Sequence, residues 1–135
     1  NGRPDLAKPY FEAVKQPLAQ RAADSARPWG RSRQLAQLAF VTAGLGEYEE
    51  AVRISEEALA MRFPDEASIT KFIGLSAAIG VFIPSGDYER AIELLDEQLA
   101  TPVGWTIEGL LNDPRIDPIR DHEGWLALVD KYARR

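Results

Sequence analysis

The most chemically suggestive run in the chain is Asp121-His122-Glu123, which places two carboxylates beside the single histidine. Such residues could carry general acid–base chemistry, but consecutive residues on a helix point in different directions. No serine nucleophile lies at a recognisable spacing from them, and the chain contains no cysteine. We therefore interpret the run as an acidic helix start with an exposed histidine, and we expect no enzyme activity.

Metal and cofactor chemistry lack the residues that they need. Without cysteine there is no thiolate for zinc, and one histidine leaves no partner for a two-histidine site. The turn Gly44-Leu45-Gly46 lacks the lysine and the hydroxyl of a phosphate-binding loop. We expect no metal and no cofactor.

Charged and aromatic side chains suggest surfaces rather than reaction centres. The net charge of −5 argues against binding to nucleic-acid backbones. We interpret the three arginines between residues 27 and 33 as a solvated face, because exposed charge is common. The same interpretation applies to the glutamates Glu47, Glu49, Glu50, Glu56 and Glu57. We expect Trp29, Trp105 and Trp125 to pack, because single-strand stacking platforms have basic residues interleaved with them.

Length and composition are those of a folded domain. The apolar share of 45% and the charged share of 27% argue against global disorder. No apolar run approaches the ~18 residues that span a bilayer. The first residues do not form a signal peptide, and they enter a helical pattern without an initiator methionine. We expect a cytoplasmic fragment of a longer protein that binds no membrane.

Helical periodicity runs through the chain, and no segment shows the sustained alternation of a strand. In the first predicted helix Leu6, Tyr10, Val14 and Leu18 recur every four residues, and two prolines inside it predict a kink or a split. The helix over 66–83 is apolar on nearly all sides, should lie at the centre of the domain and should end before Pro84. The predicted helices span 5–23, 30–43, 47–61, 66–83, 88–99, 105–111 and 121–133, with a turn-rich connector at 115–120.

Two segments, residues 46–52 (GEYEEAV) and 86–92 (GDYERAI), match in chemistry at every position except Glu50 against Arg90. They lie 40 residues apart (86 − 46). The glycine suits a left-handed turn, and the acid suits the positive end of a helix dipole. The tyrosine is expected to pack back on the preceding helix, and the alanine to let two helices approach closely. A helix pair repeated in this way buries its apolar face by stacking on neighbouring pairs.

This pattern resembles the tetratricopeptide repeat. The copies would span 32–64 and 66–102, with a partial copy at 1–26 and a C-terminal cap at 103–135. Three departures are Thr42 in place of tyrosine, Ser55 in place of an aromatic residue and Gln98 in place of alanine. The 40-residue period also exceeds the usual period of about 34. The resemblance implies a single all-α domain, a right-handed superhelix of stacked helical hairpins with a C-terminal capping helix.

The tail carries a second resemblance. Residues 113–120 (DPRIDPIR), followed by Trp125, are similar to the ending of many bacterial multidomain proteins. In those proteins such repeats follow a nucleotide cyclase, a protein kinase or a transcription-regulator domain, and the segment caps the array. The resemblance implies that Trp125 plugs the open core, and that the chain is the C-terminal part of a bacterial signalling or regulatory protein.

In the repeat family the inner face of the first helices forms a peptide groove. Mapped onto this sequence, that face carries Ala36, Ala43 and Gly80 together with the candidate partner-binding residues Arg33, Phe40, Ile73, Ser76 and Ile83. The lysine and asparagine that hold a terminal carboxylate in chaperone-binding members are absent, so no such clamp is expected. The face either binds a helix or an apolar peptide, or is filled by the chain's own terminal segment.

These observations predict a scaffolding module that binds a protein or a peptide, including a second copy of itself. The alternative is a helical domain that senses a small molecule and regulates an upstream catalytic domain. That alternative requires an enclosed apolar pocket, lined by Phe40, Leu75 and Phe82.

Overall fold

The structure, a computed structural model, describes residues 4–61, 68–101 and 104–133, and each regular element within these ranges is a helix. The chain divides into two compact units, residues 1–66 and 67–135. The all-α class is confirmed for the described residues, whereas the superhelix, the single domain and the repeat boundaries stay predictions. The predicted boundaries at 64, 66, 102 and 103, and the start of the partial repeat at 1–3, lie outside the described residues.

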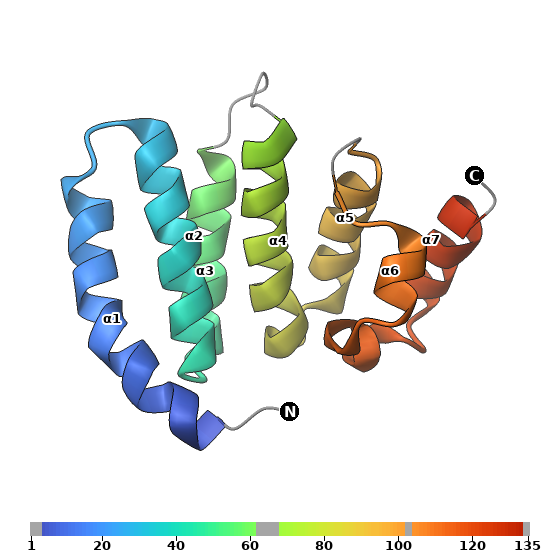
Figure 1. The fold of residues 1–135 in the computed structure, drawn as a ribbon, viewed down its shortest axis with the longest axis horizontal. Coiled ribbons are helices and arrows are strands. Elements are labelled where there is room, and N and C mark those ends of the chain that lie inside the picture. Colours follow the sequence, from blue (N-terminus) through green and yellow to red (C-terminus); the bar gives the residue numbers. More distant parts are fainter. Residues whose placement is uncertain (1–3, 62–67, 102–103, 134–135) are drawn as a thin grey trace. The chain divides into compact units, whose positions relative to one another are not determined.

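The first unit contains three helices: α1 (Pro4–Asp24), α2 (Pro28–Gly44) and α3 (Tyr48–Ala60) (Figure 1). α1 packs along α2, and α2 packs against α3. Two contacts join the start of α2 to the end of α3, so these two helices are antiparallel. Arg31 pairs with Glu57 at 3.2 Å, and the Ser32 hydroxyl donates to the carbonyl of Ala58 at 2.9 Å.

α1 is one uninterrupted helix although Pro9 and Pro17 lie inside it, so the predicted split is wrong (Figure 1). Each proline removes one backbone donor, which frees the carbonyl four residues earlier. Both prolines are exposed, so water can reach the freed carbonyls. Leu18 and Ala22 are buried and hold the helix by apolar packing.

The second unit contains α4 (Ser68–Ser85), α5 (Tyr88–Leu99), α6 (Ile107–Leu111), a 3-10 helix η1 (Pro114–Ile119) and α7 (Glu123–Ala133). α4 packs on α5 and η1, and α7 packs on α5 and α6. Lys71 near the start of α4 pairs with Glu97 near the end of α5 at 3.1 Å, so these helices are also antiparallel.

Two boundaries in this unit differ from the predictions. Pro84 does not end the helix before it but lies in the last turn of α4. Its side chain is exposed, and the loss of one donor at a helix end costs little. The expected connector at 115–120 is largely the 3-10 helix η1, whose first residue is a proline with the φ angle already set.

The 40-residue recurrence extends to the helix boundaries. α3 and α5 begin at residues 48 and 88. Ala51 and Ala91 are both 0% exposed, as expected for small residues where helices approach closely. The two tyrosines differ, because Tyr88 is half-buried whereas Tyr48 is exposed and does not pack back as predicted.

The turns after α2 and α4 have the same hydrogen-bond pattern. Gly46 and Gly86 have φ angles of 80° and 85°, which only glycine adopts without strain. The amide of Glu47 donates to the carbonyl of Thr42 at 3.2 Å, and the amide of Asp87 donates to that of Phe82 at 3.1 Å. This pairing is the Schellman motif, so the repeated glycine and acid encode one turn twice.

The tail of the second unit is held by Arg120 and Trp125. The Arg120 guanidinium donates to the carbonyls of Leu111 and Asp113 at 2.6 and 3.1 Å, and its Nε donates to Asp117 at 2.6 Å. Trp125 is only 2% exposed. These contacts fix η1 beside α6 and give the second unit a closed end.

Candidate functional site

Two of the five candidate partner-binding residues lie in the first unit, on α2. Arg33 and Phe40 are both exposed. They are seven residues apart, which places them on the same face of the helix. Ala36 between them is half-buried, and Ala43 is buried. This part of the predicted surface is therefore open.

The other three candidates lie on α4 in the second unit and differ in access. Ile73 is 50% exposed, whereas Ile83 is 4% exposed and cannot touch a partner directly. Ser76 is half-buried, and its hydroxyl accepts a hydrogen bond from the Gln98 amide at 3.5 Å. Of these three side chains, only Ile73 presents a large apolar surface.

Sequence reasoning missed three exposed apolar residues of the first unit. Leu6, Tyr10 and Trp29 are 65%, 66% and 53% exposed, so the expected packing role of Trp29 is wrong. Leu6 and Tyr10 had the four-residue spacing of a buried stripe. Each step of four overshoots a turn by roughly 40°, so Leu6 lies about 120° from Leu18 around the helix. Only Leu18 of this series is buried.

An aromatic cluster joins α1 to α2. The Phe11 ring lies edge-on to the rings of Tyr10 and Phe40, with centroid distances of 6.0 and 6.4 Å. Phe11 also covers Gly44, where an added Cβ would overlap the phenyl ring. The absence of a side chain at residue 44 thus lets the aromatic cluster sit directly on α2.

These exposed side chains lie on one side of the unit, away from α3. On α1, Lys15 pairs with Glu47 at the turn before α3, and Tyr10 lies roughly 140° around the helix from Lys15. On α2, the side chains of Arg31 and Ser32 bond to α3, and Phe40 lies roughly 180° around the helix from Arg31 and about 80° from Ser32. We call this surface the α1–α2 face, and its residues are Leu6, Tyr10, Arg21, Trp29, Arg33 and Phe40.

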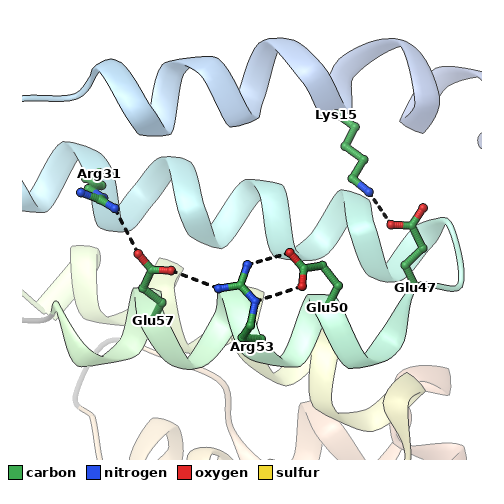
Figure 2. A network of polar contacts seen from close by, with 6 residues as sticks. All are labelled: Lys15, Arg31, Glu47, Glu50, Arg53 and Glu57. Carbon is green, nitrogen blue, oxygen red and sulfur yellow. Dashed lines mark hydrogen bonds and ion pairs between the residues drawn. The ribbon is translucent and has the colours of Figure 1, made fainter.

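Charged side chains on α2 and α3 form ion pairs with one another. Arg53 pairs with Glu50 at 2.6 Å and with Glu57 at 3.7 Å, and Glu57 pairs in turn with Arg31 (Figure 2). The hydrogen bond from Arg53 lowers the pKa of Glu50 below its ordinary value, and Glu50 raises the pKa of Arg53. Such exposed pairs contribute little stability, but they satisfy the charges on this side.

An open depression lies at the start of α3. Its lining residues are Gly46, Glu47, Tyr48, Glu49, Glu50 and Arg53. Four of its six lining residues are charged and it is open to solvent, whereas small-molecule sites are mostly apolar and enclosed. None of the residues that the small-molecule alternative requires, Phe40, Leu75 and Phe82, lines it.

The Asp121-His122-Glu123 run has a structural role. His122 is half-buried rather than exposed, and its Nδ1 accepts from the amide of Gly124 at 3.1 Å. Its ring lies edge-on to Tyr88 at 6.2 Å. The histidine thus serves as a cap at the start of α7. Within the described residues, no group of three or more histidines, aspartates or glutamates could hold a metal ion.

A search of the helices in the described part of the chain finds none with the length and apolar character that crossing a bilayer requires. Comparison with protein-family models, with curated proteins and with solved structures finds no match to this chain.

Proposed function

We propose that this chain is a protein-interaction module and that the α1–α2 face is its binding surface. The observation that carries the proposal is the exposure of four large apolar side chains on two adjacent helices. Leu6, Tyr10, Trp29 and Phe40 are between 49% and 66% exposed. The rings of Tyr10 and Phe40 both lie against Phe11, and exposed apolar patches mark binding sites in soluble proteins.

The chemistry of these residues suits binding. Burying one large apolar side chain contributes roughly 1.5–3 kcal/mol, so a partner that covers all four gains substantial binding energy. Tryptophan, tyrosine and arginine are the residues that dominate interface energetics, and each occurs on this face. The small-molecule alternative has less support, because the described depression is open and lies at the start of α3.

The helix pairs support a finer proposal about architecture. The recurrence of boundaries, turns and buried alanines at 40 residues favours a tetratricopeptide-like superhelix of stacked hairpins. The tail, with its buried Trp125, favours a capping role at the end of such an array. We place the module in a bacterial regulatory protein on the resemblance of this tail.

Quantitative affinity capture tests the binding surface. The bait is the full chain, compared with a variant carrying Tyr10→Ser and Phe40→Ser. A matched control is Glu49→Ser, which alters an exposed residue on α3 with no ion pair among the described residues. We expect proteins captured from a bacterial lysate by the wild type and the control to be lost from the double variant. Equal capture by all three baits would contradict the assignment of this face.

Light scattering of the same three proteins tests self-association through the face. A dimer that dissociates in the double variant but not in the control identifies a second copy as the partner. A wild-type chain that stays monomeric and captures nothing would overturn the proposed function.

A further inference from the structure

We infer that the α1–α2 face binds an acidic amphipathic helix. This inference rests on the proposed function and names the class of partner. It is carried by the charge of the face, by two arginines on it that form no ion pair within the described part of the chain, and by the spacing of its exposed apolar residues.

The helices that form the face are basic in a chain that is acidic. Residues 4–44 contain six lysines and arginines against three aspartates and glutamates, whereas the whole chain has a net charge of −5. α3 has the opposite balance, with four glutamates and one arginine over residues 48–60. The field over α1 and α2 therefore favours an anionic partner, and interfaces pair surfaces of opposite potential.

The arginines on the face are available to a partner. Lys15 and Arg31 are engaged across to α3, by Glu47 and Glu57. Arg21 and Arg33 are exposed and form no ion pair with any residue that the structure describes. An arginine can bind a carboxylate through two parallel hydrogen bonds, so each offers a geometrically specific site for glutamate or aspartate.

One acidic group does lie at the end of the face. Asp24 closes α1, and its carboxylate accepts from the Gln20 amide at 3.0 Å through each oxygen. This carboxylate lies at the last residue of α1, at the end of the face where α2 begins with Trp29. The rest of the face, with Arg21 and Arg33, carries positive charge.

The spacing of the apolar residues favours a helical ligand. Trp29, Arg33 and Phe40 recur at intervals of four and seven residues and form one stripe on α2, about 16 Å long. Leu6, Tyr10 and Arg21 form a second stripe on α1, which packs along α2. A third helix with apolar residues every three or four positions can lie across two such stripes, with acids at its borders facing the arginines.

The experiment is a display selection from random helical peptides of about 18 residues against the immobilised full chain. We expect the enriched peptides to be net acidic, with apolar residues at helical spacing. The best peptide is then labelled and titrated by fluorescence anisotropy, beside a counterpart in which every glutamate is lysine. We expect the counterpart to bind at least roughly tenfold more weakly, and the difference to shrink as salt is raised.

Three variants locate the interaction. Reversing both arginines, Arg21→Glu with Arg33→Glu, should invert the preference in favour of the lysine peptide. Phe40→Ser should weaken both peptides, and the control Glu49→Ser should change neither. Circular dichroism of each variant separates lost binding from lost folding, because all four positions are exposed.

Other outcomes overturn the inference. An acidic helical partner would be contradicted if the selection enriches nothing or enriches neutral or basic peptides. It would also be contradicted if reversing the two arginines leaves the affinity for the acidic peptide unchanged. If Phe40→Ser still abolishes capture from lysate, the proposed function stands while the inference falls. Arginine-dependent pelleting with phosphatidylglycerol vesicles, without peptide binding, would assign the face to an anionic membrane surface instead.

Discussion

The α2–α3 pair and the α4–α5 pair share their turns and several ion pairs 40 residues apart, but they differ in their buried residues, as at Thr42 and Phe82, and on their surfaces. The ion pair Arg31–Glu57 recurs 40 residues later as Lys71–Glu97, with charges of the same sign. The exposed pair Glu50–Arg53 recurs as Arg90–Glu93 with the charges exchanged. The one mismatch between the repeated segments is thus compensated three residues later, so the interaction is kept although the residues are not.

The two pairs differ further on the side of the first helix that belongs to the proposed binding face. Arg33 and Phe40 correspond to Ile73 and Gly80, so the second pair lacks both the cation and the aromatic ring. Inside the pairs, Ala58 corresponds to Gln98, and Ala51 corresponds to Ala91. The comparison indicates that the two glycine turns and the close contact at Ala51 and Ala91 are kept, whereas the side of the first helix that carries Arg33 and Phe40 varies.

The largest effect is expected from replacing Trp125, the buried tryptophan that closes the second unit. Trp125 is almost completely buried on α7, which packs on α5. Trp125→Ala removes a large side chain from the core and should destabilise the second unit by about 3–5 kcal/mol. Urea unfolding, followed by a probe in each unit, measures the loss. An unchanged midpoint would contradict the role of Trp125 in closing this unit.

Enlarging the buried alanine of either pair should lower the free energy of unfolding by a similar amount. Ala51→Leu and Ala91→Leu each insert three carbons where the native side chain is 0% exposed. Overpacking of this kind costs typically about 1–3 kcal/mol, so both variants should show lower free energies of unfolding. A substitution tolerated in one pair only would show that the two helix contacts are not equivalent. Ala60→Leu, at an exposed position of α3, is the control.

The repeated turn offers a smaller and equally matched effect. Gly46→Ala and Gly86→Ala place a Cβ on a residue with positive φ but meet no neighbouring atom. The cost is therefore conformational alone, about 1–2 kcal/mol at each site. Thermal unfolding of the two variants should give similar shifts. A shift at one glycine and none at the other would break the equivalence of the turns.

The smallest change in stability is expected at Gln98, which stands where the first pair has Ala58. Gln98 is 0% exposed, and its Oε1 accepts no hydrogen bond from the residues that the structure describes. Gln98→Leu removes this unsatisfied acceptor at similar volume and should be neutral or stabilise the chain by up to about 1 kcal/mol. Ser76→Ala should change little by itself, because its bond to Gln98 is long at 3.5 Å. Strong destabilisation by Gln98→Leu would contradict this account of the buried amide.

The sequence predicted the helices and the two glycine turns well because their signals are local. The repeated segment of seven residues contains both a glycine that adopts a positive φ angle and an alanine that lets two helices approach closely. The helix α5 begins and ends at the predicted residues. The three departures from the family pattern, Thr42, Ser55 and Gln98, are the buried polar residues of the described chain. The comparison with the tetratricopeptide pattern located these three residues, but it did not predict which hydrogen bonds their buried hydroxyl or amide groups form.

The exposed residues of the α1–α2 face were only partly predictable. Arg33 and Phe40 follow from the register of α2, whereas Leu6 and Tyr10 fell on a four-residue spacing that drifts around the helix. Ile83 was placed on the inner face by the repeat pattern, but it is buried. Which side chains stay exposed depends on the packing of α1 on α2 through Phe11 and Gly44, and that long-range contact has no local signal.

Side-chain footprinting of the full chain by hydroxyl radicals tests the central claim most directly, in the presence and absence of the selected peptide or a captured partner. We expect protection of Tyr10, Trp29 and Phe40, with unchanged reactivity at the exposed Leu126 of the second unit. Protection of Ile73 or Leu126, with Tyr10, Trp29 and Phe40 unchanged, would contradict the account.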